Sequence, residues 1–166
     1  MFGENSFDIV VSTEMLEHVL DWKTVVSNLK RVLKPNGQLF ITTRSFGFRY
    51  HAYPYDFWRY EIDDFKNIFM DMTIVKLEKD TDAPGVLLKA IKPKDFNEKD
   101  LTDIGLYEIV LNRKMKSLSL ESKDFKSKMK VIVRHENNKK KRRMRKMKGR
   151  ALTNQINNFF ATVFHK

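Results

Sequence analysis

The chain begins with a strand-like pattern that is followed by a helical one. Two short apolar runs rich in β-branched and aromatic residues, 7–12 and 38–43, are each typical of a buried strand in a parallel sheet. Between them, apolar residues recur at steps of three and four over 22–33, after Asp21 as N-cap. Pro35-Asn36-Gly37 is expected to end this helix and turn the chain. The pattern predicts a β-α-β unit with parallel strands and a right-handed crossover.

The alternation continues through residue 92. An aromatic-rich connection over 45–60 leads to a helix expected to start near Asp63, because acidic residues favour a helix N-terminus. The runs 72–77 and 85–91 read as strands separated by turn residues, which predicts an antiparallel pair. The predicted order is therefore β-α-β-α-β-β, an α/β fold.

Charge divides the chain into parts that need separate interpretations. Residues 1–92 contain 12 Lys or Arg and 13 Asp or Glu, whereas residues 93–166 contain 20 and 8. We therefore predict an α/β domain over 1–92 and a basic C-terminal tail over 136–166. The intervening segment 93–135 has too little apolar mass for its own core. A weak helical stripe over 101–111 predicts that this segment is a peripheral helix or linker.

Composition also excludes several classes. The chain of 166 residues has no Cys, so it holds no disulfide and no Cys-based metal site. No run of about 18 apolar residues is present, so we expect no membrane span. The N-terminus shows no secretory signal. We expect a cytoplasmic protein, with the nucleus as the alternative that the basic run over 139–150 suggests.

This basic run has nine Lys or Arg among its twelve residues. Such a run repels itself, so we expect an extended or frayed, partly helical or disordered tail. It is a candidate nucleic-acid contact through phosphates, since no aromatic is interleaved for base stacking. The alternative is a solvated tail without a partner. The candidate residues are Lys139, Lys140, Lys141, Arg142, Arg143 and Arg145.

Three segments together resemble a known family: FDIVVSTEMLEHV over 7–19, RVLKPNGQLFITT over 31–43 and HAYPYDFWRY over 51–60. They are similar to the C-terminal half of a class I S-adenosylmethionine-dependent methyltransferase of the type 11 group. The resemblance covers about 1–92. It implies a partial Rossmann-like sheet made of the last four strands of that fold, whose full order is 3-2-1-4-5-7-6.

The resemblance implies S-adenosylmethionine as cofactor and methyl transfer to a small-molecule acceptor. In that family a glycine-rich loop and a ribose-binding acid lie in the first half of the fold, and this chain has 6 Gly and no Gly-x-Gly. We therefore expect a truncated methyltransferase, weak or inactive as this chain alone. The alternative is a non-catalytic binding module with a basic arm for nucleic acid or a protein partner. Without the first strands, strand 7–11 becomes a sheet edge, which we expect a partner, a second copy or the segment 101–133 to cover.

Four residues after the first strand are candidates for the chemistry. Ligands bind outside the carboxyl ends of parallel strands, so Ser12 and Thr13 are candidate cofactor-binding residues. Glu14 and His18, one helical turn apart, are candidate catalytic residues, with His18 as general base. The alternative is that these side chains only cap and pack the turn.

A second set of candidates lies in the aromatic connection. An Arg can hold an acidic substrate group, and loop aromatics can form a lid over a small substrate. In the alternative reading the aromatics plug the sheet and an Asp–Arg pair three residues apart braces the loop. We expect no metal site. The candidate substrate-binding residues are His51, Tyr53, Asp56, Trp58 and Arg59.

Overall fold

The computed structural model describes residues 2–51 and 55–164, which divide into two compact units, 1–119 and 120–166. The first unit contains a four-stranded sheet in the order β1-β2-β5-β4. β1 pairs parallel to β2, and the other two pairs are antiparallel. This is the predicted end of the family's sheet, 4-5-7-6. The strands are β1 (Phe7–Thr13), β2 (Leu33–Arg44), β4 (Thr73–Lys79) and β5 (Gly85–Ile91).

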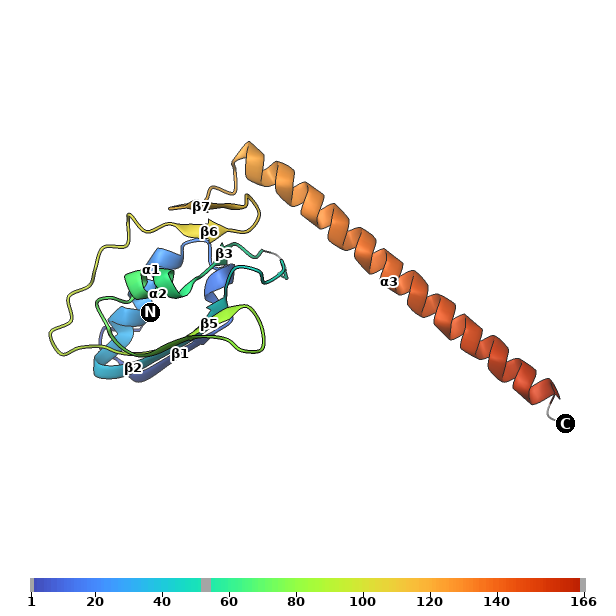
Figure 1. Ribbon diagram of the computed structural model, residues 1–166, viewed down its shortest axis with the longest axis horizontal. Coiled ribbons are helices and arrows are strands. Elements are labelled where there is room, and N and C mark those ends of the chain that lie inside the picture. The colour runs from blue at the N-terminus through green and yellow to red at the C-terminus, as the bar shows by residue number, and fades with distance from the viewer. Residues whose placement is uncertain (1, 52–54, 165–166) are drawn as a thin grey trace. The chain divides into compact units, whose positions relative to one another are not determined.

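Three helical segments connect these strands. The short 3₁₀ helix η1 (Leu16–His18) follows β1, α1 (Trp22–Val32) leads into β2, and α2 (Ile62–Ile68) precedes β4. Asp21 caps α1 as predicted, because its carboxylate accepts from the backbone N–H of Thr24 at 3.2 Å. Figure 1 shows α1 and α2 on the same side of the four-stranded sheet.

The core lies between this sheet and the helices. In β2 and β5, buried residues alternate with half-buried ones, so that one face of each strand is covered. The covered face carries Leu39, Ile41, Val86, Leu88 and Ala90, each at most 3% exposed. Helix residues such as Trp22, Val26 and Phe65 are buried as well.

The boundary between α1 and β2 differs from the prediction. Pro35-Asn36-Gly37 was expected to separate helix from strand, but β2 already begins at Leu33. The register explains the difference: Phe7 pairs with Leu33 and Ile9 with Gln38, so four residues of β2 stand opposite the single residue Asp8. Asn36 has a φ of 64° within this bulge. The turn is present, but it is accommodated inside the strand.

The segment after residue 92 differs more strongly. The helical stripe over 101–111 is wrong, because β6 (Leu106–Glu108) and β7 (Arg113–Met115) form a small antiparallel sheet with β3 (Trp58–Arg59), in the order β3-β6-β7. Leu106 and Glu108 are buried and Tyr107 between them is half-buried, a period of two. Pairing with β3, which lies far away in the sequence, decides the conformation here, and a local pattern does not register such pairing.

The second unit is helical. α3 spans Lys123–Phe164 and includes both the basic run and the apolar C-terminal residues. The helical alternative of the expected tail is confirmed, and the extended one is not observed among the described residues: Lys, Arg and Met are good helix formers, and a helix points their charges outward. Among the described residues, no helix is long and apolar enough to cross a membrane.

β1 forms one free edge of the sheet, as expected, since it pairs only with β2 among the described strands. Its outward-facing residues Ile9 and Val11 are 56% and 64% exposed. The expectation that strand 7–12 is buried is wrong. Of the three covers proposed for it, the segment 101–133 contributes β6, which pairs with β3.

Candidate functional site

The carboxyl end of β1 carries the first predicted residues. Ser12 is 5% exposed, and its hydroxyl has no hydrogen-bond partner among the described residues. Thr13 beside it is exposed. At Glu14 the backbone takes a left-handed φ of 50°, which turns the chain from the strand toward η1. A buried hydroxyl without a partner is costly, so Ser12 is available to a ligand at this edge.

Glu14 and His18 were both predicted to be catalytic, and their side chains have different partners. The Glu14 carboxylate accepts from the Thr42 hydroxyl at 3.0 Å and forms an ion pair with Arg44. Both partners lie on β2, so Glu14 is tied to the neighbouring strand. His18 instead lies beside Glu17 and His51.

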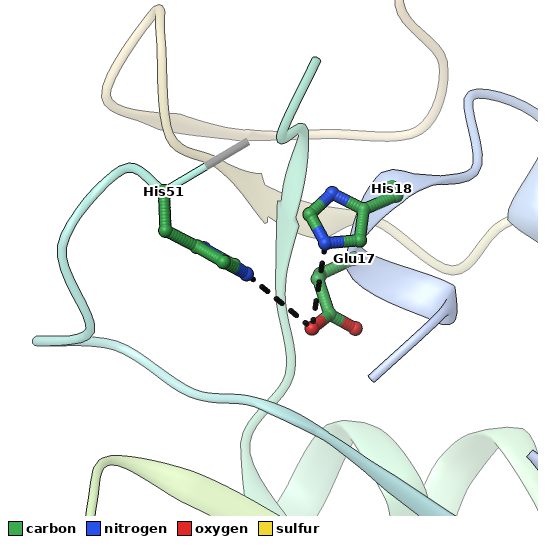
Figure 2. A group of neighbouring side chains, drawn as sticks. All are labelled: Glu17, His18 and His51. Atoms are coloured by element: carbon green, nitrogen blue, oxygen red, sulfur yellow. Dashed lines mark ion pairs between the residues drawn. The ribbon is translucent and has the colours of Figure 1, made fainter. Parts of the chain in front are cut away.

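Glu17, His18 and His51 form a cluster, hereafter the Glu-His-His cluster (Figure 2). Glu17 is completely buried, and its Oε1 lies 3.9 Å from Nε2 of each histidine. The two imidazole rings are 4.8 Å apart, and their side chains are 32% and 26% exposed. η1 supplies two members and the aromatic connection the third, so two distant segments meet at this point.

Hydrogen bonds at the other ring nitrogens fix both histidines. Nδ1 of His18 lies 2.9 Å from the carbonyl oxygen of Tyr55, and Nδ1 of His51 lies 2.8 Å from Oδ2 of Asp56. Because both partners only accept, each Nδ1 carries the hydrogen. In the neutral rings each Nε2 then presents a lone pair toward Glu17.

Asp56 and Arg59 were predicted to bind substrate, and the structure gives them a bracing role. They form a bidentate pair in which both side chains are at most 1% exposed. Arg59 also donates to the carbonyl oxygens of Phe48 and Arg49. These contacts use the guanidinium and exclude solvent from it, so a substrate acid has no access.

The other loop residues predicted to bind substrate are Trp58, Tyr53 and His51. Trp58 is fully buried, and its Nε1 donates to the carbonyl oxygen of Val19 at 2.9 Å, so it packs the loop against the chain after η1. Tyr53 lies outside the described residues. Five loop residues were proposed to bind substrate. Among those that the structure describes, His51 has a partly exposed side chain that lies next to His18.

Tyr60 forms a hydrogen bond to η1, which carries Glu17 and His18. Its hydroxyl donates to the carbonyl oxygen of Leu16 at 3.2 Å, which anchors η1. Complete burial raises the pKa of Tyr60 well above its ordinary value, with smaller contributions from the negative charges of Glu17 and Asp64. The phenol is thereby kept neutral.

Sequence reasoning missed Glu17. The available signal was an acid directly before His18 in the segment that follows a buried strand, but a helical reading favoured Glu14, one full turn away. The 3₁₀ geometry of η1 and the left-handed turn at Glu14 decide which carboxylate joins the histidine. The meeting with His51 depends on the loop and is not visible in the local sequence.

The N-terminal part of the chain is similar to known proteins. Residues 1–41 match the family model described as a methyltransferase domain. The mitochondrial ubiquinone biosynthesis O-methyltransferase of Bos taurus is 53% identical over 38 residues, 23% of this chain and 10% of the relative. The ubiquinone biosynthesis O-methyltransferase of Pasteurella multocida is 42% identical over 40 residues, 24% of this chain and 16% of the relative.

Residues 1–41 are thus similar in sequence to a methyltransferase domain. The resemblance stated from the sequence is confirmed for this part, while the matches span a small fraction of each relative. Solved structures of methyltransferases also resemble this chain, at low sequence identity. A methyltransferase of Haloferax volcanii, in complex with the Trm112 methyltransferase activator, has a TM-score of 0.45 at 16% identity, covering 55% of this chain and 56% of that one. An S-adenosylmethionine-dependent methyltransferase of Methanosarcina mazei has a TM-score of 0.43 at 18% identity, covering 55% and 62%.

Proposed function

We propose that this chain carries the acceptor-facing part of an S-adenosylmethionine-dependent methyltransferase site that acts on a hydroxyl group of a small molecule. The observation that carries the proposal is the position of His18, just beyond the carboxyl end of β1, with its Nε2 lone pair available. The match of residues 1–41 supports the methyl donor. The matched relatives are O-methyltransferases, which supports oxygen as the acceptor atom.

The reaction assigns a role to each available group. The acceptor oxygen forms a bond to the methyl carbon as the bond from that carbon to the cofactor's sulfur breaks. The hydroxyl proton passes to Nε2 of His18, and Tyr55 stabilises the resulting imidazolium through Nδ1–H. S-Adenosylhomocysteine is the leaving product. Ser12 and Thr13 are the residues of this chain that would contact the cofactor.

The chain offers only part of a binding site for the cofactor. The unpartnered, buried hydroxyl of Ser12 suits a ligand at this edge, and the sequence offers no Gly-x-Gly loop for the methionine moiety. We therefore expect the chain to bind S-adenosylhomocysteine with a dissociation constant weaker than ~100 μM. The binding should nevertheless be located at the end of β1.

The test is an NMR titration of the isotopically labelled full chain with S-adenosylhomocysteine. We expect amide shifts at Ser12, Thr13 and His18, and a several-fold weaker response in Ser12→Ala. The matched control is Ser117→Ala, because Ser117 is an exposed serine of the same unit. Saturating shifts elsewhere, or none at this edge, would remove the support for a methyl-donor site in this chain. A low-micromolar constant would show instead that the expectation of weakness is wrong.

A second candidate function concerns α3. We propose that its basic run contacts nucleic-acid phosphates. Among the described side chains of 139–147, one ion pair is found, Lys139 with Glu136 at 3.6 Å, so most of these cations lack an intramolecular partner. A helix that presents unpaired cations to solvent attracts a polyanion and releases its counterions.

Fluorescence anisotropy with a labelled single-stranded RNA tests this candidate. Gln replaces Lys139, Lys140, Lys141, Arg142, Arg143 and Arg145 in the full chain. If all six contact phosphates, the slope of log affinity against log salt should fall in magnitude by about 4. The control replaces six exposed lysines of the first unit, and the affinity should then hardly change. Equal losses in both variants would indicate a non-specific charge effect. The control lysines are Lys66, Lys76, Lys79, Lys94, Lys99 and Lys116.

A further inference from the structure

The Glu-His-His cluster brings three electron-pair donors together without a hydrogen between them. The tautomers fixed by Tyr55 and Asp56 leave both Nε2 atoms unprotonated in the neutral rings, and both face the carboxylate of Glu17 (Figure 2). The ligand atoms of the three residues all lie within 4.8 Å of one another. Three lone pairs pointing at a common space repel one another unless a positive charge lies between them.

Glu17 supplies the second observation. Its side chain is 0% exposed, and Oε2 accepts from the Thr43 hydroxyl at 2.7 Å. Oε1 has no hydrogen-bond partner among the described residues, although it is buried and faces both histidines. A buried carboxylate oxygen without a partner is unfavourable, so a cation or a proton at this position would stabilise the folded chain.

The acceptors at the Nδ1 atoms of the two histidines are of the kind that orients metal-binding histidines in other proteins. Metal-binding histidines usually donate the other ring N–H to a carbonyl or carboxylate, which fixes the ring and raises its basicity. His18 does so to a carbonyl oxygen and His51 to a carboxylate. That carboxylate, Asp56, is itself held by Arg59 and by the backbone N–H of His51. All three ligands are thus positioned before any ion arrives.

We propose that Glu17, His18 and His51 bind a divalent transition-metal ion of the Zn²⁺ type, with an open coordination position toward solvent. Two imidazoles and one carboxylate match the protein ligand set of catalytic zinc sites, whereas Mg²⁺ and Ca²⁺ prefer oxygen ligands. Ligands about 2.1 Å from a tetrahedral ion lie about 3.4 Å apart. Glu17 lies 3.9 Å from each histidine and all three ligand atoms lie within 4.8 Å of one another, so an ion would draw the three side chains closer together. The partly exposed imidazoles leave room for a fourth ligand.

This site goes beyond methyl transfer and does not depend on it. An ion would occupy the Nε2 lone pair of His18, so the metal-ligand and general-base roles of His18 are alternatives. A metal could instead polarise a bound hydroxyl directly. Glu14 is not part of the set, because Thr42 and Arg44 hold its carboxylate.

The test measures Zn²⁺ binding to the full chain by competition with a chromophoric chelator, after removal of any metal carried through purification. We expect one equivalent to bind with a dissociation constant of ~1 μM or below. His18→Ala, His51→Ala and Glu17→Gln should each weaken binding by at least tenfold. The matched control is His135→Ala, since His135 is an exposed histidine of α3 and should leave binding unchanged.

A second readout covers variants that fold poorly. Co²⁺ added to the wild-type chain should give the intense visible absorption of a four-coordinate site with nitrogen ligands, and Zn²⁺ should abolish it. Circular dichroism checks each variant, and Glu17→Gln retains an acceptor for Thr43. Absence of Zn²⁺ binding to the wild-type chain, equal losses in the His135 variant, or a six-coordinate Co²⁺ spectrum would each overturn the proposal.

Discussion

The guanidinium of Arg59 donates two hydrogen bonds to the carboxylate of Asp56, from Nη1 to Oδ1 at 2.5 Å and from Nη2 to Oδ2 at 2.7 Å, and both side chains are buried. The same carboxylate accepts from Nδ1 and from the backbone N–H of His51. The pair therefore links the closure of the aromatic loop to the orientation of one histidine of the cluster.

Arg59→Leu should lower the free energy of unfolding by about 3–5 kcal/mol, because it leaves a buried carboxylate without its cation. Adding Asp56→Asn should recover part of this loss, since no uncompensated charge then remains. Urea denaturation measures both. Arg49→Leu is the control: Arg49 is exposed in the same loop, and its replacement should change stability by less than about 0.5 kcal/mol. A similarly small effect at Arg59 would contradict the bracing role.

The free edge at β1 predicts self-association. Ile9 and Val11 face outward and are exposed, and Asp8 is the one charged residue between Phe7 and Ser12. The opposite edge, β4, carries Lys76, Glu78 and Lys79, which oppose strand pairing with another molecule. We expect the purified chain to be oligomeric or poorly soluble, with β1 at the contact.

Size-exclusion chromatography with light scattering checks this prediction. Val11→Lys should shift the chain toward a monomer by placing a charge on the β1 edge. Val75→Lys is the matched control, because Val75 is 52% exposed on the other edge strand. A wild-type monomer whose Ile9 and Val11 amides exchange rapidly with solvent would show that β1 needs no cover. Equal effects of both variants would show that general hydrophobicity, not the β1 edge, causes association.

The sheet was predictable because its signals are local. Short β-branched runs, the Asp21 cap and the acids in the first turn of α2 each specify an element, and the resemblance supplied the strand order that β1-β2-β5-β4 confirms. Where the outcome depends on distant pairing, the local pattern failed. β6 is the example: a weak helical stripe gave way to strand pairing with β3, some fifty residues earlier.

The site follows the same division. The position of Ser12 near the end of β1 was predictable from the strand pattern, and the binding of a ligand there stays a prediction from the rule that ligands bind at the carboxyl ends of parallel strands. The partner of His18 was not, because a left-handed residue at Glu14 and a 3₁₀ turn change which side chains share a face. His51 was grouped with the other candidates of its loop, and its contact with Glu17 was not predictable because only the folded loop brings the two side chains together.

Tyr60 predicts how stability depends on alkaline pH. Burial raises its pKa well above 10, so the folded chain keeps the phenol neutral while the unfolded chain ionises it. A group whose pKa is raised on folding contributes its full stabilisation below the unfolded pKa of about 10 and loses it as the pH rises toward the folded pKa. The wild-type chain should therefore lose stability above about pH 10 partly through this one residue.

Tyr60→Phe isolates this contribution. At neutral pH the variant should be less stable by about 1 kcal/mol, because the carbonyl of Leu16 loses its donor. Between about pH 9 and pH 11 the wild-type chain should lose about 1.4 kcal/mol of stability relative to the variant, since Phe cannot ionise in the unfolded chain, so the variant should become the more stable of the two near pH 11. Urea denaturation at a series of pH values measures it. Phe65→Leu, a substitution of a buried neighbour that cannot ionise, should keep the wild-type pH slope. A difference between Tyr60→Phe and wild type that stays constant over this range would mean that the phenol of Tyr60 ionises as readily in the folded chain as in the unfolded one.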